Sequence, residues 1–245
     1  MPNPLTHFEF MTNDPDRISG FYSNLFGWEM HHIPEMGYTI IKTGHVPGGG
    51  LGTPREGQDT GVTLYLDVAD IDSMLRKASG LGWNIEMPKY QIDENVGSMA
   101  LISDFDGNIL GLFQGPESAD RQPPAENEPG REHLGHFEVG ITDLEKAKKW
   151  YAGLFDWEIE DVGGIEYSIL KSERPPFCGL FKVPGNIPPY AMFYVQTDDI
   201  ERRLGDAVEL GGKVIVEKTK ISDHYGYFAI FSDPDGNNIG LSGQK

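Results

Sequence analysis

Cysteine is almost missing from this chain of 245 residues, since Cys178 is the only one. One cysteine cannot form a disulfide within the chain, and this sparing use is typical of proteins from a reducing compartment. The first six residues contain neither the basic nor the apolar segment of a secretory signal peptide. We therefore expect a cytoplasmic protein.

Basic residues and long apolar runs are also scarce. The chain has 20 Lys and Arg against 38 Asp and Glu, which gives a formal net charge of −18. A surface of this charge repels phosphate backbones and anionic lipids, so neither nucleic acid nor a membrane surface is an expected partner. No apolar run is long enough to cross a bilayer. We expect a soluble protein, either a monomer or a homodimer.

What the chain does contain is one long internal repeat. An offset of 129 residues carries residues 7–10 (His-Phe-Glu-Phe) onto residues 136–139 (His-Phe-Glu-Val) without a gap. A repeat of this length indicates two copies of one folding unit rather than a solenoid of short repeats. The same offset matches Asp14 with Asp143, Tyr22 with Tyr151, Trp28 with Trp157, Tyr38 with Tyr167, Gly50 with Gly179, Tyr65 with Tyr194, and Asp106 with Asp235.

Each half in turn contains two similar segments. Residues 7–12 alternate as a strand does, and Asp14-Pro15 then begins an amphipathic helix. Asp70, 56 residues after Asp14, begins a second helix of the same kind. The sequence therefore predicts an α+β fold of four βαβββ modules. We expect a first domain at 1–115, a linker rich in Pro, Glu and Asn at 116–132, and a second domain at 133–245.

Three motifs occur in both halves. A strand His precedes the helix-capping Asp by seven residues, the helix ends in Tyr-x-x-Leu-Phe-x-Trp, and a Ser-Asp-x-Asp-Gly-Asn turn precedes the last strand. In these motifs the chain resembles the vicinal oxygen chelate superfamily, which includes glyoxalase I, bleomycin-resistance proteins and extradiol dioxygenases. It looks most like the two-copy glyoxalase-like or hydroxylase-like members, whose last strand reads Gly-Leu-Phe-Gln as at 111–114. The resemblance covers almost everything except the linker and implies two eight-stranded cupped sheets or barrels.

The resemblance also implies where a divalent metal would bind, and most of those positions have lost their ligands. His7 and His136 stand at the matching first-strand position. The ligand position on the first strand of each half's second module is occupied by Thr63 and Met192. The last-strand position, where the superfamily has Glu, is occupied by Gly111 and Gly240. The fourth ligand position, near Leu51 and Leu180, offers no ligand either. A catalytic metal needs about three or four protein ligands. We therefore expect no metal cofactor; the alternative is a rearranged site for Fe, Ni, Zn or Mn.

The candidate site residues are those expected to point into the cups. His7 and Glu9, like His136 and Glu138, lie two residues apart and so share one strand face, with their Cα atoms about 7 Å apart. Each Glu is either exposed to water or hydrogen-bonded to a nearby hydroxyl. Alternatively, it is a general base whose pKa is raised by burial. A third possibility is a His-x-Glu metal pair completed by a residue such as His45 or His224. Tyr65 and Tyr194 are further ligand-binding candidates that are equally compatible with core packing, and Thr63 is a weaker candidate.

Three functions follow as hypotheses. The leading one is a metal-independent protein of the glyoxalase/bleomycin-resistance type that binds a small organic molecule in its cups. The second is a metal-dependent lyase, isomerase or dioxygenase with a rearranged site. The third is a scaffold without catalysis that acts through protein contacts.

Overall fold

The structure is a computed structural model that describes residues 3–54, 60–116 and 132–244. These residues form four α-helices: α1 (Pro15–Phe26), α2 (Ile71–Leu81), α3 (Leu144–Phe155) and α4 (Ile200–Glu209). Each helix begins after an aspartate whose carboxylate accepts a hydrogen bond from the backbone N–H three residues later, as Asp14 does from Arg17. The predicted helix starts at Asp14 and Asp70, and at their counterparts Asp143 and Asp199 in the 129-residue repeat, are thereby confirmed.

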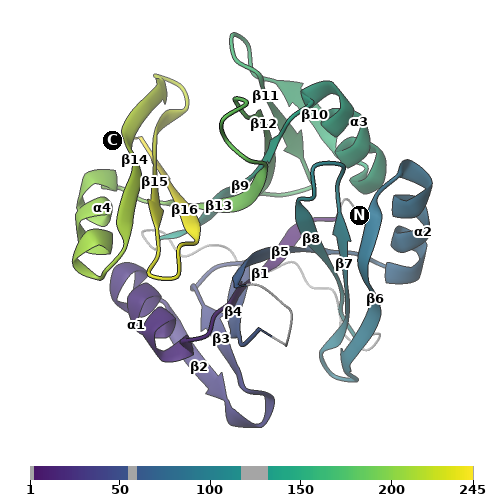
Figure 1. Cartoon of the computed structure of the whole chain (residues 1–245), viewed down its shortest axis with the longest axis horizontal. Coiled ribbons are helices and arrows are strands. Elements are labelled where there is room, and N and C mark those ends of the chain that lie inside the picture. Colours follow the sequence, from purple (N-terminus) through teal and green to yellow (C-terminus); the bar gives the residue numbers. More distant parts are fainter. Residues whose placement is uncertain (1–2, 55–59, 117–131, 245) are drawn as a thin grey trace. The chain divides into compact units, whose positions relative to one another are not determined.

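Four strands accompany each helix, in the order βαβββ (Figure 1). The first module has β1 (Leu5–Met11), β2 (Glu29–Ile33), β3 (Tyr38–Lys42) and β4 (Gly48–Gly52), and the second has β5 (Gly61–Asp67), β6 (Asn84–Asp93), β7 (Gly97–Ser103) and β8 (Ile109–Gln114). The third has β9 (His133–Ile141), β10 (Glu158–Asp161), β11 (Tyr167–Lys171) and β12 (Phe177–Lys182), and the fourth has β13 (Tyr190–Gln196), β14 (Lys213–Ser222), β15 (Gly226–Ser232) and β16 (Asn238–Gly243). A short 3₁₀ turn at Pro34–Met36 separates β2 from β3.

The strands form two eight-stranded sheets. Their orders are β2-β3-β4-β1-β5-β8-β7-β6 and β10-β11-β12-β9-β13-β16-β15-β14, so each sheet has two different end strands and is open rather than a closed barrel. The predicted α+β fold of four βαβββ modules in two eight-stranded sheets is thereby confirmed. In each module the first strand runs parallel to the last, which sets His7 opposite Gly48 and Tyr65 opposite Gly111.

The chain divides into two compact units that do not follow the sequence halves. Unit 1 consists of residues 1–6, 63–123 and 136–191, and unit 2 consists of residues 7–62, 124–135 and 192–245. Unit 1 therefore joins the second and third modules, and unit 2 joins the first and fourth. The division into domains 1–115 and 133–245 stays a prediction, and nearly all of the predicted linker lies outside the described residues.

Aromatic side chains form the core of each unit. In unit 2 Phe8 and Phe10 are fully buried and contact Phe193, with ring centroids 5.0 and 6.0 Å apart. In unit 1 Trp157 stacks on Phe155 at 4.7 Å, and Trp83 meets Phe155 edge-on. Phe8 and Phe10 share one face of β1, as the alternating pattern predicts, so the other face is left to the polar residues.

The Asp-Gly-Asn turns join the modules within each unit. The hydroxyl of Tyr22 donates to Asp233 at 2.9 Å in unit 2, and the hydroxyl of Tyr151 donates to Asp104 at 2.7 Å in unit 1. Asp104 also accepts from the backbone N–H groups of Asp106 and Asn108, both at 2.9 Å. These buried carboxylates are therefore satisfied by the protein itself, as expected for hairpin turns rather than calcium loops.

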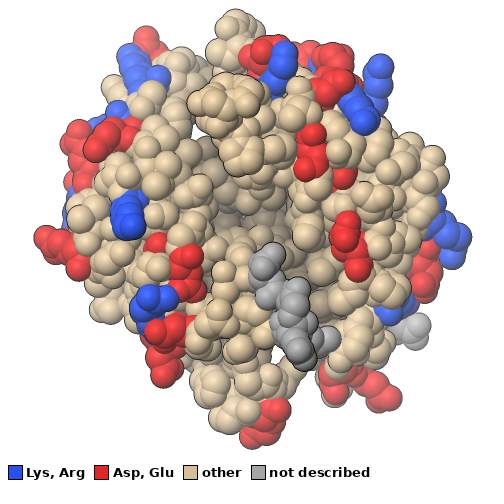
Figure 2. Space-filling model, viewed as in Figure 1, with Lys and Arg blue, Asp and Glu red and all other residues tan. Residues whose placement is uncertain are grey.

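None of the helices in the described ranges is both long and apolar enough to span a membrane. On the face shown in Figure 2, Lys and Arg side chains are interspersed among Asp and Glu rather than gathered in one patch. Nucleic-acid-binding surfaces instead cluster their basic residues on one face.

Candidate functional site

A buried histidine is hydrogen-bonded to a tyrosine in each copy. The Nε2 atom of His7, on β1, lies 2.9 Å from the hydroxyl of Tyr38, on β3. Its counterpart, the Nε2 atom of His136 on β9, lies 2.6 Å from the hydroxyl of Tyr167 on β11. Burial lowers the pKa of both histidines to about 4, because the charged imidazolium loses its hydration. Both rings are therefore neutral at pH 7.

A glycine makes each of these pairs possible. Gly50 on β4 lies between β1 and β3, and a Cβ atom there would stand 1.9 Å from the hydroxyl oxygen of Tyr38. A Cβ atom at Gly179 on β12 would stand 1.9 Å from the hydroxyl oxygen of Tyr167 and 2.6 Å from Nε2 of His136. No other residue leaves space for the tyrosine to cross the intervening strand and reach the histidine.

A buried glutamate lies beside each pair. Glu9 and Glu138 are only 8% and 7% exposed. Glu9 is hydrogen-bonded to Tyr38, whose pKa is raised by burial and by the charge of Glu9. The hydroxyl of Tyr190, at the start of β13, donates to Oε1 of Glu138 at 2.6 Å, and burial together with this carboxylate raises the pKa of Tyr190. Each carboxylate is thus held by a phenol.

In the first copy the three groups form a chain His7–Tyr38–Glu9. A carboxylate can only accept, so the single phenolic proton of Tyr38 goes to Glu9. The oxygen of Tyr38 then accepts from His7, which places the imidazole hydrogen on Nε2. This chain can hold a negative charge on Glu9 in a buried place and can accept hydrogen bonds from a bound molecule.

Tyr65 and Tyr194 occupy a different place, over the glycines of the last strands. Tyr65 is 4% exposed and lies opposite Gly111 in the parallel pair of β5 and β8. A Cβ atom at Gly111 would stand 2.1 Å from Cδ1 of Tyr65, and one at Gly240 would stand 2.1 Å from Cδ1 of Tyr194. The two rings therefore fill the space that a side chain at residue 111 or 240 would need.

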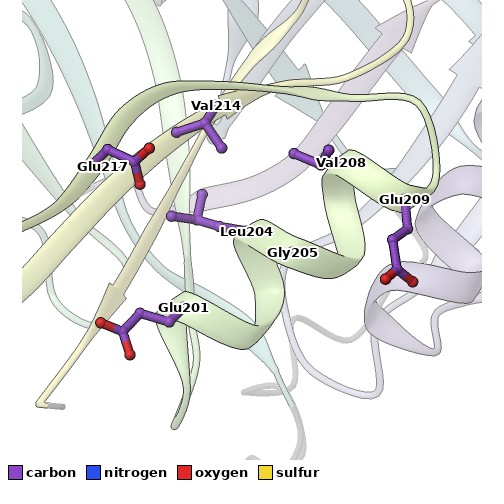
Figure 3. A pocket seen from close by; sticks show the side chains of 7 residues that line it. All are labelled: Glu201, Leu204, Gly205, Val208, Glu209, Val214 and Glu217. Carbon is purple, nitrogen blue, oxygen red and sulfur yellow. The ribbon is translucent and has the colours of Figure 1, made fainter.

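Among the hollows that the described residues form, two have linings that include none of these groups. A groove of about 450 Å³ runs between α4 and β14, where Leu204 and Val214 point toward one another (Figure 3). The rest of its lining is Glu201, Gly205, Val208, Glu209 and Glu217. Its lining contains neither histidine nor tyrosine. The second hollow, of about 580 Å³, lies in unit 1 beside the 183–189 loop that precedes Tyr190.

Sequence comparison assigns the chain to a family. A profile described as the Glyoxalase/Bleomycin resistance protein/Dioxygenase superfamily matches residues 133–241, and one described as Bleomycin resistance protein-like N-terminal matches residues 5–44. The second half of the chain therefore belongs to this superfamily. "Putative glyoxylase CFP32" from Mycobacterium tuberculosis is 28% identical over 240 residues, which cover 93% of this chain and 90% of that protein.

Solved structures of superfamily enzymes share the fold. Homoprotocatechuate 2,3-dioxygenase from Brevibacterium fuscum matches with a TM-score of 0.69 and 14% identity, over 98% of this chain and 81% of that one. The Mn(II)-bound glyoxalase from Novosphingobium aromaticivorans matches with a TM-score of 0.66 and 13% identity, over 99% of this chain and 82% of that one. At these identities the likeness concerns the fold alone.

The residues at these positions do not fit the metal centre that the resemblance implies. The Nε2 atoms of His7 and His136 already bond tyrosine hydroxyls, and the last-strand positions 111 and 240 are glycines beneath tyrosine rings. Among the described residues, no three His, Cys, Asp or Glu side chains are grouped so as to hold a metal ion. His45, which could have completed a metal pair, packs instead against His133, with ring centroids 4.8 Å apart.

The structure brings some candidate residues together and adds three others. His7 and Glu9 share one strand face, and so do His136 and Glu138. The site residues that the sequence analysis did not identify are Tyr38, Tyr167 and Tyr190. The 129-residue offset already matches Tyr38 with Tyr167 and their glycines with each other, which is a signal that could have pointed to both pairs. Tyr190 matches Gly61, so the repeat carries no sign of it.

Proposed function

We propose that this superfamily member binds a small organic molecule on the sheet faces that carry the His–Tyr–Glu groups, and that it does so without the divalent metal of its relatives. The observation that carries the proposal is the pairing of each first-strand histidine with a tyrosine hydroxyl, at 2.9 Å in one copy and 2.6 Å in the other. A histidine held in this way is a hydrogen-bonding group in a buried polar site.

The chemistry of these groups suits a bound organic molecule. A few fixed polar groups among apolar and aromatic walls are the usual composition of a small-molecule site. Each copy supplies a neutral imidazole, a phenol and a buried carboxylate. The carboxylates are acceptors only, so they favour ligands with hydroxyl or ammonium groups and disfavour anions.

Metal analysis tests the metal-independent part of the proposal. The full chain is purified without a metal-affinity tag, and Fe, Ni, Zn and Mn are measured by mass spectrometry, together with the double variant His7→Ala/His136→Ala. We expect far less than one ion per chain in both proteins. One ion per copy, lost in the double variant, would overturn the proposal and make a metal-dependent lyase, isomerase or dioxygenase the working assignment.

Ligand titration tests the binding part. Benzyl alcohol, benzylamine and benzoate share one ring and differ in their polar group, so they sample a neutral donor, a cation and an anion. Each is titrated into the isotope-labelled protein and followed by NMR. We expect saturable shifts for at least one probe. If all three leave the spectrum unchanged, small-molecule binding is refuted and a scaffold function takes its place.

A further inference from the structure

The groove between α4 and β14 has an apolar floor, and its lining includes three glutamates. Leu204 and Val214 point toward one another across it, and Val208 also lines it (Figure 3). Leu204 is buried, whereas Val208 is 49% exposed. A Cβ atom at Gly205 would meet nothing within 4 Å, so the space beside this helix residue is open. An apolar body in the groove would therefore remove Val208 from water.

The 129-residue repeat shows which parts of this groove the two copies share. The floor residues Leu204 and Val214 match Leu75 and Ile85, so both copies have an apolar pair at these positions. The lining positions that differ, given for the first copy and then for the second, are Arg76 and Gly205, Ser79 and Val208, Gly80 and Glu209, and Pro88 and Glu217. The second copy has therefore lost a cation from the helix and gained two carboxylates and one apolar side chain.

Two of the three carboxylates in the groove are not engaged by the protein. The Nζ atom of Lys218 lies 3.6 Å from Oε1 of Glu201, and the matched residues of the first copy form an ion pair too, at 3.1 Å. Within the described residues, the carboxylates of Glu209 and Glu217 have neither a hydrogen bond nor an ion pair. The two carboxylates that only the second copy has are therefore available to a cation from outside.

The size of the groove indicates a small molecule rather than a protein partner. Its volume of about 450 Å³ lies within the range of about 300–1,000 Å³ that is usual for small-molecule sites. Seven residues line it, whereas a stable protein interface involves about 20–30 residues on each side.

The spacing of the glutamates indicates the length of this molecule. Glu201 and Glu209 are the second and the last residue of α4, so their Cα atoms lie about 12 Å apart along the helix axis. Lys218, the neighbour of Glu217, reaches Glu201, and in Figure 3 Glu201 and Glu217 lie on one side of Leu204 while Glu209 lies on the other. The two unengaged carboxylates therefore stand at opposite ends of the apolar floor.

We infer that this groove binds a small aliphatic molecule with a cationic group at each end, of which an aliphatic diamine is the simplest example. Its methylene chain would cover Leu204, Val208 and Val214. Its ammonium groups would meet Glu209 at one end and Glu217 at the other. The groove is lined by none of the His–Tyr–Glu groups, so the inference does not depend on the proposed function.

Matched aliphatic probes test the inference on the full chain. Octamethylenediamine is titrated at low ionic strength, where surface charges are least screened, and the methyl resonances of Leu204, Val208 and Val214 are followed by NMR. Its ammonium groups are about 11 Å apart when the chain is extended, since each backbone bond advances about 1.25 Å. We expect saturable shifts. Octylamine, with one ammonium group, should bind about twofold to fivefold more weakly, and suberate, with two carboxylates, should leave the resonances in place.

Two double variants separate this site from the general attraction of a cation to a chain with a net charge of −18. Glu209→Gln/Glu217→Gln removes the unengaged carboxylates, so octamethylenediamine should bind about fivefold more weakly. Glu35→Gln/Glu94→Gln makes the same change in net charge at two exposed glutamates outside the groove, and it should leave binding unchanged.

A substitution at Gly205 is expected to block the groove. Gly205→Arg introduces the residue that the first copy has at the matched position, and its guanidinium would take the place of an external cation, so the saturable shifts should be lost. Gly205→Ala is the control, because its methyl group meets nothing within 4 Å, and binding should persist. Both replacements favour a helix interior over glycine, and an unaltered backbone spectrum outside the groove shows that each variant is folded.

Four results would overturn the inference. They are the absence of saturable shifts at the three groove residues, binding of octylamine or suberate as tight as that of octamethylenediamine, equal affinity of the two double variants for octamethylenediamine, and saturable binding that persists in Gly205→Arg. The benzyl probes and the metal analysis test the His–Tyr–Glu groups separately, so each of these results leaves the proposed function standing.

Discussion

A side chain at residue 111 would overlap the ring of Tyr65, so we predict that Gly111→Ala destabilises the protein. The new Cβ atom would stand 2.1, 2.4 and 2.5 Å from three ring atoms of Tyr65, whereas ordinary contacts between carbon atoms begin near 3.4 Å. The ring must therefore move by about 1 Å or more in a core position that is only 4% exposed. Overpacking of this kind costs about 1–3 kcal/mol, and the severity of this overlap favours the upper end.

The free energy of unfolding measures this cost. Urea denaturation followed by far-ultraviolet circular dichroism is compared for the wild type, Gly111→Ala and Gly61→Ala. Gly61 also lies on a strand, but a Cβ atom there would meet nothing within 4 Å. Gly61→Ala is therefore expected to be neutral or to stabilise by up to about 1 kcal/mol through the unfolded chain. Gly111→Ala is expected to lower the midpoint, with an unchanged slope, by the equivalent of about 2–3 kcal/mol.

A second substitution identifies the ring as the cause. Tyr65→Ala leaves a cavity and is destabilising alone, but it removes the atoms that residue 111 would meet. In the Tyr65→Ala background, Gly111→Ala should lower the free energy of unfolding by less than about 0.5 kcal/mol. Compared with its cost in the wild type, this is a coupling energy of about 2 kcal/mol between the two substitutions. If Gly111→Ala is instead as stable as Gly61→Ala in the wild-type background, the reasoning about the last-strand glycines is wrong.

Three further predictions concern the first-strand groups and the thiol. Tyr38→Phe, which removes the partner of His7, should lower the free energy of unfolding by about 1–3 kcal/mol in urea, because a buried donor and a buried carboxylate lose their bond. The folded pKa of His7, about 4, lies below the value of about 6.5 for an unfolded chain. As the pH falls, His7 is therefore protonated in the unfolded state before it is protonated in the folded state. The contribution of the neutral ring to the free energy of unfolding is complete above about pH 6.5 and declines by up to about 3 kcal/mol towards pH 4. His7→Gln should make the free energy of unfolding less dependent on pH in this range. Cys178 is 1% exposed and burial raises the pKa of its thiol, so a thiol reagent should modify it only on the timescale of unfolding, measured with and without urea. A fast reaction of Cys178 in native buffer would contradict the prediction for the thiol. A pH profile of stability that His7→Gln leaves unchanged would contradict the prediction for His7.

The fold could be predicted because its signals are local and occur more than once. An aspartate cap before an apolar helical stripe can be recognised within a dozen residues, and it recurs at Asp14, Asp70, Asp143 and Asp199. The repeat then turns one recognised module into four. The glycine-rich segment 48–52 carries no such local signal, because its glycines are required by neighbours that are distant in sequence. It forms a regular strand, β4, whose glycines give space to Phe8 and Tyr38.

The site could be predicted only in part, because it depends on how strands pair. Sequence places His7 and Glu9 on one face of a strand, which needs only the alternation of side chains. It does not show that β4 separates β1 from β3, and that register is what brings Tyr38 to His7. The grouping of modules is even less visible, since the bond between Tyr22 and Asp233 joins residues 211 positions apart.

The two copies serve as an internal control for one another. Features at both matched positions, such as the histidine–tyrosine pair and the glycine beneath it, meet a requirement that both copies share, either of the fold or of a common chemistry. Features in only one copy meet no such requirement, because the other copy folds without them. Tyr190 is such a feature, and its hydroxyl reaches the buried carboxylate of Glu138 at 2.6 Å. Its ring also fills the space above Gly140, so in the second copy β13 supplies the side chain over the β9 position that matches Met11 in the first.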